Sequence, residues 1–442
     1  MPSRSEIAYF GAGPAPLPTA AIEQSAQAFV NFQDTGLSLA EISHRSPTAN
    51  KILSDAKDAL ATLYDIPTDE YDVLFMQAGG TGEFSATVQN LVGYWIEKRR
   101  RKAIAELGEG KDAEVLDRVK REVEAELKVD YLVTGSWSLK ASQEASRLLG
   151  AKYVNVAVDA RKSNNGKFGK IPDEKEWKLT PKGSAFTYYC DNETVDGVEF
   201  PGFPKSLEST TGAGEDDDER IVVADMSSNF LSRKIDVRKF GVIFGGAQKN
   251  LGITGITVVI IRKSLLSLVP PPTFLHALSP VLPTSGALPP IIFSFSTIAS
   301  NNSLYNTLPI FNLYVATVVL QMLVSTFGQK KVSGQEEVAD RKAALIYGAL
   351  DAHPDTYHVV PDKSVRSRMN ICFRIISGTP SDGQVVADEA KEKAFLAGAE
   401  KRGLLGLKGH RSVGGMRASN YNAVLLESAQ KLADYLVEFA KS

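Results

Sequence analysis

The residue best placed for covalent chemistry is Lys249. It stands in an uncharged turn after a strand-like run that ends in two glycines, within GVIFGGAQKN (241–250). A lysine held near apolar groups loses its proton more readily, as a Schiff-base nucleophile must. Taken alone, this pattern also fits a surface lysine in a turn.

Asp225 supplies the partner that such a lysine needs in one class of enzyme. It ends the strand-like run 221–224 and lies 24 positions before Lys249 (249 − 225). Enzymes that use pyridoxal 5'-phosphate (PLP) hold the pyridine nitrogen protonated with an aspartate and bind the cofactor through a lysine. Ligands of open α/β sheets bind at the carboxyl ends of strands. We therefore expect the two side chains to converge there and to bind PLP.

A cofactor phosphate needs its own site, and the glycine-rich segment 79–82 (GGTG) offers one. It follows the strand-like run 71–76 and opens a helix-like stretch. Free N–H groups and the helix dipole favour an anion at such a helix start. The segment matches neither the G-x-G-x-x-G dinucleotide pattern nor a P-loop, and a simple tight turn would also explain it.

Trp137 is the aromatic candidate for this site. It follows the strand-like run 131–133, between Ser136 and Ser138. An aromatic ring there could stack on a cofactor ring. A partly buried tryptophan at the start of a helix is the equally simple alternative.

Anion-binding side chains occur in two histidine–arginine pairs. His44 precedes Arg45 in SHRS, and His410 precedes Arg411 in KGHRSVGGMRAS, which also contains Arg417. Arginine grips carboxylate and phosphate groups in a bidentate manner. Each pair alone is typical of a protein surface, but together they indicate a doubly anionic substrate.

The elements that must position these residues alternate between strand-like and helix-like over the first 270 positions. Near-continuous Val and Ile runs flanked by glycines indicate strands buried on both faces, and their alternation with helices predicts a mostly parallel sheet. The last 110 or so residues are α+β, which predicts a second, smaller domain. The apolar run 308–327 is long enough for a membrane span, but polar residues interrupt it, and we expect a buried core or interface helix. The expected strands are 71–76, 131–133, 153–158, 185–189, 221–224, 241–244, 256–261 and 367–376.

Composition narrows the class of protein. The chain has 442 residues, a net charge of −2, 43% hydrophobic and 23% charged residues, which is ordinary for a globular protein and excludes intrinsic disorder. A nucleic-acid binder is usually basic overall. Five consecutive basic residues, 98–102, favour such a partner locally, but a solvated helical excursion explains them better, because Leu116, Val119 and Val123 further on fall on one helical stripe. Two cysteines and no secretory signal favour the cytoplasm.

Taken together, these segments resemble the phosphoserine aminotransferase family, which are PLP-dependent transaminases of fold type I. The resemblance covers nearly the whole chain except longer segments at about 98–130, 209–220 and 270–290. The matching segments are FGAGPAPLP, SHRS, QAGGTGEF, TGSW, CDNETVDGVEF, VADMSSNFLS, GAQKN, SLYNT, KGHRSVGGMRAS and NYNA.

The family fold is α/β. It implies a large PLP-binding domain over 17–328, with a mostly parallel seven-stranded sheet flanked by helices and insertions at about 98–130 and 209–220. A smaller α+β domain would occupy 329–442, and the N-terminal segment 1–16 would join the two. The family also implies a homodimer with shared active sites.

The resemblance assigns cofactor roles to matching residues. Lys249 would bind PLP as the Schiff base, Asp225 would pair with the pyridine nitrogen, and Trp137 would stack on the ring. Thr194 would hydrogen-bond the 3-hydroxyl oxygen. The implied phosphate ligands are Gly80, Thr81 and Gln248, with Asn306 and Thr307 from the partner subunit.

Substrate roles follow in the same way. Arg417 would hold the α-carboxylate, while His410 and Arg411 would hold the substrate phosphate. His44 and Arg45 from the other subunit would complete the phosphate site. The implied reaction moves an amino group between L-glutamate and 3-phosphohydroxypyruvate, giving O-phospho-L-serine and 2-oxoglutarate in serine biosynthesis. Neither nucleic acid nor membrane is expected as a partner, and no metal.

Three alternatives remain at this point. The first is another fold type I activity, such as a cysteine desulfurase or a different transaminase. A desulfurase would need a mobile catalytic cysteine, whereas Cys190 sits beside a strand-like run and Cys372 within one. A non-catalytic PLP-binding relative would be expected to lack Lys249 or Asp225. A nucleic-acid binder would show salt-dependent retention of RNA or DNA.

Overall fold

The centre of the molecule is a seven-stranded sheet with the strand order β2-β10-β9-β8-β5-β3-β4. A computed structural model describes residues 2–181, 184–208, 220–377 and 386–442. All neighbouring strands run parallel except β10, which is antiparallel to both β2 and β9. The expected mostly parallel sheet is therefore confirmed. The strands are β2 (Tyr71–Met76), β3 (Val129–Val133), β4 (Val154–Asp159), β5 (Thr187–Cys190), β8 (Val222–Asp225), β9 (Val242–Gly246) and β10 (Thr257–Arg262).

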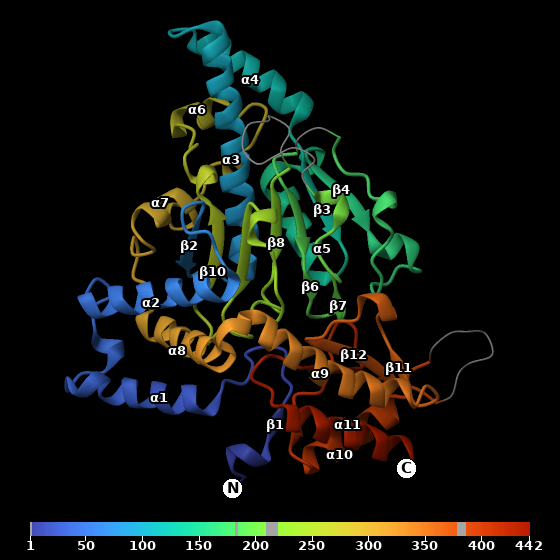
Figure 1. The fold of residues 1–442 in the computed structure, drawn as a ribbon. Helices are drawn as coiled ribbons and strands as arrows, with labels where there is room; N and C mark the ends of the chain where they lie inside the picture. The colour runs from blue at the N-terminus through green and yellow to red at the C-terminus, as the bar shows by residue number, and fades with distance from the viewer. Residues whose placement is uncertain (1, 182–183, 209–219, 378–385) are drawn as a thin grey trace.

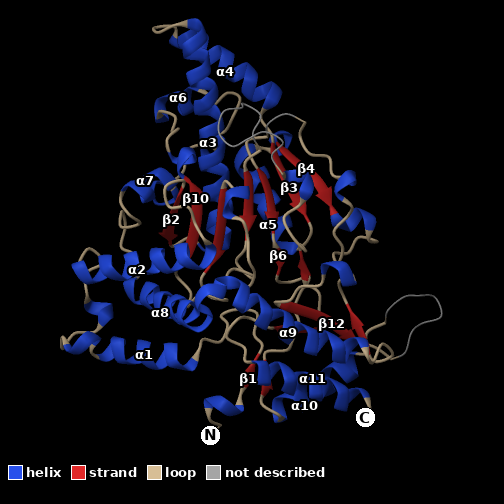
Figure 2. Cartoon of the chain, in the orientation of Figure 1, coloured by secondary structure: helices blue, strands red, loops and turns tan. Residues whose placement is uncertain are grey.

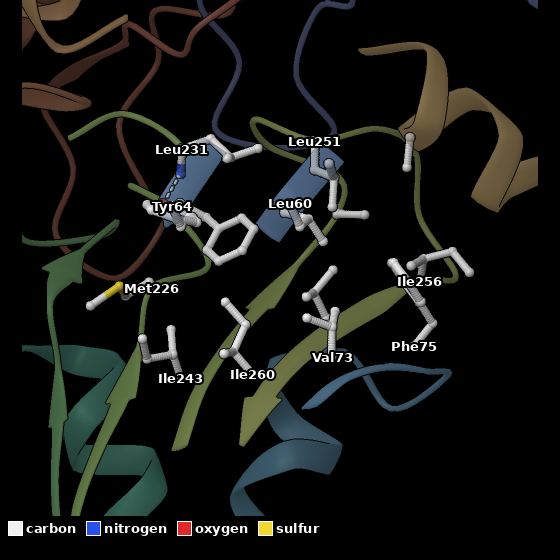
Figure 3. Close-up of a cluster of buried hydrophobic side chains, with 14 of the residues drawn as sticks. Leu60, Tyr64, Val73, Phe75, Met226, Leu231, Ile243, Leu251, Ile256 and Ile260 are labelled. Carbon is white, nitrogen blue, oxygen red and sulfur yellow. Dashed lines mark hydrogen bonds between the residues drawn. The ribbon is translucent and has the colours of Figure 1, made fainter. Parts of the chain in front are cut away.

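Helices cover both faces of this sheet (Figures 1 and 2). Successive residues of a strand point to opposite faces, and Val73 and Leu74 accordingly belong to two different hydrophobic clusters. Val73 packs in the cluster that contains Leu60 and Tyr64, which Figure 3 shows beside the sheet residues Ile243 and Ile260. The helices of that face are α2 (Pro47–Tyr64) and α8 (Ile310–Phe327), and those of the other face are α3 (Gly79–Leu107) and α5 (Ser136–Leu149).

The apolar helix α8 is the one helix among the described residues that is long and apolar enough to cross a membrane, in a span that continues into α9. It lies against α2 and α1 (Thr19–Val30) (Figure 1), and its residues 315–320 are all buried. A core helix of a folded domain can also be apolar on all sides, because neighbouring elements cover its faces. Its packing agrees with the expectation of a core or interface helix.

A second cluster of elements surrounds a small antiparallel sheet of order β11-β12-β14. The N-terminal strand β1 pairs in parallel with β13, so both ends of the chain enter this part of the molecule. The α+β pattern expected for the last 110 residues is present, while the domain limits 17–328 and 329–442 stay a prediction. The elements are β1 (Ala8–Tyr9), α9 (Lys331–Asp351), β11 (Tyr357–Val359), β12 (Asn370–Ile375), α10 (Glu389–Lys401), β13 (Leu404–Leu405), β14 (Met416–Ser419) and α11 (Leu426–Ala440).

The charged segment after position 98 forms helix rather than loop. Helix α3 continues to Leu107, and α4 (Asp112–Glu126) packs back against it, projecting beyond the sheet in Figure 1. Val119 and Val123 are buried as expected, but Val115 completes the buried stripe and Leu116 is only partly buried. Arg99 bonds Glu126 at 3.0 Å, so acidic side chains of α4 offset the basic run. Of the acidic stretch 209–220, only Arg220 lies within the described residues.

The remaining regular elements are short. They connect the sheet to α8 or lie at the edge of the site. They are β6 (Asn192–Glu193), β7 (Val198–Glu199), α6 (Pro272–Ala277) and α7 (Phe295–Ser300).

One lysine of α9, Lys342, is fully buried. Its ammonium group donates to the carbonyl oxygens of Tyr421 and Val424, each at 2.8 Å, and lies 3.5 Å from that of Asn420. Burial lowers its pKa to about 7. Lys342 therefore holds the loop after β14 in place. The same loop contacts the N-terminal segment, because the Tyr421 hydroxyl donates to the Ala12 carbonyl oxygen at 3.0 Å.

Candidate active site

Lys249 lies in the turn that follows β9, where its Nζ donates to the hydroxyl oxygen of Thr194 at 2.7 Å. Thr194 stands between β6 and β7 in a fully buried hairpin. Burial lowers the pKa of Lys249 to about 8, although the charge of Asp225 opposes the change. The structure thus brings together three residues that the sequence singled out, and it gives the lysine the depressed pKa that a nucleophilic amine requires.

Asp225 ends β8, the strand beside β9, and its carboxylate is held on one side only. Oδ1 accepts the N–H of Ser227 at 2.9 Å and its hydroxyl at 2.6 Å, whereas among the described residues Oδ2 has only the hydroxyl of Tyr188 at 3.4 Å. Burial raises the pKa of Asp225, while the Ser227 hydrogen bonds and the charge of Lys249 counteract this. Oδ2 is therefore the oxygen available to a ligand.

The start of helix α3 faces Asp225. Gly79 has a positive φ of 60° and its N–H donates to the hydroxyl of Thr257 at 2.7 Å, which fixes the turn from β2 into the helix. A Cβ on Gly80 would lie 3.7 Å from Asp225 Oδ2, so the glycine keeps the space beside that oxygen open. Thr81 is exposed and Gln248 is partly buried. These positions suit the anion site expected at a helix N-terminus.

Trp137 lies in the first turn of α5 and is partly buried. Its backbone N–H donates to Glu193 Oε2 at 2.8 Å, one residue before Thr194. Its ring N–H is buried and has no hydrogen-bond partner among the described residues. The Nζ of Lys140 lies 4.4 Å from the ring centroid. The ring is thus tied through the backbone to the hairpin that contacts Lys249.

Positive charge gathers next to this ring. Arg417 donates to the Thr194 carbonyl oxygen at 3.3 Å. Burial and the charges of Arg417, Lys140 and Arg411 together lower the pKa of His410. Arg411 itself is exposed. Of the predicted anion-binding residues in 408–419, Arg417 therefore lies by Thr194 and Lys249, and His410 lies by Arg417 and Lys140.

The other predicted anion-binding pair occupies a different place. Arg45 donates to the Tyr305 carbonyl at 3.5 Å, and the side-chain amide of Asn306 donates to that of Gln77. His44 has a buried ring nitrogen without a partner among the described residues. Within the described part of the chain, no hydrogen bond or ion pair joins these residues, or the exposed Thr307, to Lys249. The segments 43–46 and 303–307 thus lie together.

Neither cysteine has the setting of a nucleophile. Cys190 and Cys372 are both free and buried, with their thiols 3.3 Å from the Asn192 carbonyl and 3.5 Å from the Val195 carbonyl. Burial raises the pKa of both thiols. A catalytic thiol needs the opposite, a lowered pKa and access to substrate, which argues against the desulfurase alternative.

This geometry can be set beside known proteins. A family model described as "Aminotransferase class-V" matches residues 112–432. The chain belongs to this family. It is 42% identical to the phosphoserine aminotransferase of Saccharomyces cerevisiae over 99% of this chain and 98% of the relative. Fold type I and the aminotransferase interpretation of the sequence are confirmed.

Solved structures of the family agree. A phosphoserine aminotransferase from Bacillus circulans has a TM-score of 0.75 and 33% identity, covering 98% of both chains. A PLP-bound phosphoserine aminotransferase from Trichomonas vaginalis also has a TM-score of 0.75, with 32% identity over 98% of this chain and 100% of that one. Class V aminotransferases of this kind use PLP, so the cofactor expected from Lys249 and Asp225 is confirmed.

Sequence reasoning missed four side chains of the site. Glu193 and Asp196 lie within the segment CDNETVDGVEF, where only Thr194 received a role, and Ser227 lies two positions after Asp225. The available signal was four acidic residues within one short segment, Asp191, Glu193, Asp196 and Glu199. Lys140 gave none, because an exposed lysine in a helix is ordinary.

Proposed function

We propose that the chain is a phosphoserine aminotransferase of serine biosynthesis. It transfers the amino group between L-glutamate and 3-phosphohydroxypyruvate, giving O-phospho-L-serine and 2-oxoglutarate. The observation that carries the proposal is the Lys249 amine, which has a lowered pKa, bonds Thr194, and feels the charge of Asp225. Full-length similarity to relatives of that name supports the choice of substrates.

The residues present fit PLP. Asp225 Oδ2, with only a long contact of 3.4 Å from the Tyr188 hydroxyl among the described residues, could accept from a pyridine nitrogen, and Gly80 leaves room beside it. Thr194 offers a hydroxyl to the ring oxygen and Trp137 offers its ring for stacking. Bound PLP supplies an electron sink for the carbanion formed at the substrate α-carbon. The phosphate would be held by Gly80, Thr81 and Gln248, with Asn306 and Thr307 of a second subunit.

Lys249 then has two tasks. Its unprotonated Nζ would hold the cofactor between turnovers, and when a substrate amine takes that place, the freed Lys249 amine would act as the general base that accepts the proton from the substrate α-carbon. A pKa of about 8 suits both tasks near neutral pH, since the amine can accept and release a proton with little cost. Asp225 keeps its negative charge against the ring nitrogen, and Thr194 keeps Lys249 aligned.

Substrate selection falls to the cationic side chains. Arg417 lies against Thr194 and would grip the α-carboxylate. His410 and Arg411 would take the phosphate of the phosphorylated substrate. His44 and Arg45 would reach the same phosphate from a second subunit, together with the segment around Tyr305 that Arg45 contacts.

This arrangement requires a homodimer with shared sites, and the proposal includes one. It also includes the two-domain division at 17–328 and 329–442, with 1–16 joining them, and a cytoplasmic location without nucleic-acid or membrane partners. The N-terminal segment comes close to Lys249, because a Cβ on Gly13 would lie 3.5 Å from Lys249 Cγ. The N-terminal segment thus forms part of the wall around the lysine.

One experiment tests the activity. Purified protein is mixed with PLP, L-glutamate and 3-phosphohydroxypyruvate, and formation of phosphoserine is followed beside a Lys249→Ala variant. We expect product from the wild type and loss of it in the variant. PLP binding without product would indicate a non-catalytic relative, and equal activity of both proteins would remove Lys249 from the mechanism.

A further inference from the structure

Glu193 is a fully buried carboxylate on which three hydrogen bonds converge. Oε2 accepts the N–H of Trp137 at 2.8 Å. Oε1 accepts the N–H of Ser138 at 2.9 Å and its hydroxyl at 2.6 Å. Burial and the charge of the nearby Asp196 raise the pKa of Glu193. Burying a carboxyl group costs desolvation free energy, and the hydrogen bonds from helix α5 offset part of this cost.

Asp196 completes the contact with the same helix. Its Oδ2 accepts the N–H of Ser136 at 2.6 Å. Because α5 begins at Ser136, the first three N–H groups of the helix, which lack partners within it, all bond to carboxylates of one hairpin. The oxygens of Glu193 and Asp196 thus satisfy donors that the helix itself leaves open. The helix is therefore capped from a segment 55 to 60 positions away.

Gly135 shows how closely the two segments approach. A Cβ at this position would lie 2.3 Å from Glu193 Cδ and 2.6 Å from its Oε2. No side chain can occupy position 135 while Glu193 keeps its place. The backbone before α5 is thus shaped around this one carboxylate.

The hairpin that carries Glu193 also carries the contact to Lys249. Thr194, the next residue, accepts from Lys249 Nζ at 2.7 Å. Trp137 and Lys249 are therefore linked through two adjacent residues of one rigid, buried hairpin. We propose that Glu193, assisted by Asp196, is a positioning residue that sets the Trp137 ring at the correct place relative to Lys249 and so determines how well PLP fits. The inference rests on the proposed function, because it takes Trp137 as the stacking residue.

A double-mutant cycle on PLP affinity tests this role. The apoproteins of the wild type, Glu193→Gln, Trp137→Ala and the double variant are titrated with PLP and followed by visible circular dichroism. Loss of the hydrogen bond from the Trp137 backbone N–H to Glu193 should weaken PLP binding about 10-fold when Trp137 is present. In the Trp137→Ala background, Glu193→Gln should change affinity by less than about twofold.

Two further variants keep the test decisive. Asp388→Ala removes a carboxylate that caps α10 through the N–H of Lys391 at 2.9 Å, and PLP affinity should stay unchanged. Asp196→Asn gives a milder perturbation of α5 and should weaken PLP in the same background-dependent way. If Glu193→Gln does not fold, Asp196→Asn carries the cycle.

The outcomes separate the two proposals. Equal losses with and without Trp137, or an equal loss in Asp388→Ala, would overturn the positioning role while transamination by the wild type stands. A wild type that binds no PLP would overturn the proposed function together with this inference.

Discussion

Lys342 gives the fold a pH-dependent stability that methionine in its place should remove. Methionine has a similar length and fills the buried site without a charge. In the folded protein, burial lowers the pKa of Lys342 to about 7, against an ordinary value of 10.5. At 1.36 kcal/mol per pKa unit, this difference in pKa means that the protonated lysine lowers the free energy of unfolding by at most about 5 kcal/mol.

The sign follows from proton counting. Between pH 7 and 10.5 the unfolded chain binds more protons at Lys342 than the folded one, so the free energy of unfolding rises with pH. Below pH 7 both states are protonated and this slope vanishes. Wild type should therefore gain about 2 kcal/mol over Lys342→Met when the pH moves from 7 to 9. The carbonyls left without a donor destabilise the variant equally at both pH values.

Urea unfolding of the holoenzymes at pH 7, 8 and 9, followed by far-UV circular dichroism, measures this difference. Lys263→Met is the matched control, because Lys263 also donates to a carbonyl, that of Thr68 at 2.7 Å, but is exposed. That variant should keep the pH dependence of the wild type. A wild type–Lys342→Met difference that stays constant to about 0.5 kcal/mol would mean that the carbonyls hold the charged form, and the reasoning would be refuted.

The remaining predictions concern the site. Arg411→Ala should raise KM for the phosphorylated keto acid roughly 10- to 100-fold and leave that for glutamate nearly unchanged, since a charged hydrogen bond to phosphate is lost; steady-state kinetics would contradict this by showing equal losses. Gly135→Ala should destabilise the protein by about 1–3 kcal/mol and weaken PLP binding, because its Cβ would lie 2.3 Å from Glu193; an unchanged Tm and affinity would argue against the packing. The rate at which apoprotein captures PLP should rise with pH and level off above about 8, where Lys249 is unprotonated; stopped-flow absorbance with a midpoint near that of a free lysine would disprove it.

The sequence predicted those parts of the molecule that depend on local pattern. Strand β2 was expected at 71–76 and is found there, because a run of buried apolar residues between polar turns has one simple interpretation. Lys249 and Asp225 were found for a related reason, since strand ends in an open sheet meet at one edge.

What the sequence did not predict depends on distant partners. Glu193 caps a helix that begins 57 positions earlier (193 − 136), and nothing in local spacing announces such a contact. In α4 the buried stripe includes Val115 instead of the expected Leu116. The packing against α3 decides which face of α4 is buried, and the helical periodicity of the sequence alone does not. Arg45 and Asn306 likewise bond to residues that are distant in the sequence, so local spacing could not predict these contacts.

The pairing of β1 with β13 bears on how the molecule is made. Ala8 pairs with Leu404, a separation of 396 positions (404 − 8), and Ala12 bonds Tyr421. Contacts of such sequence distance close late in folding, because the chain must first lose the entropy of a very large loop. During synthesis the segment that forms the wall beside Lys249 leaves the ribosome well before β13, so it cannot pair with that strand until Leu405 has been made. A nascent fragment that lacks β13 therefore cannot hold this part of the wall through β1.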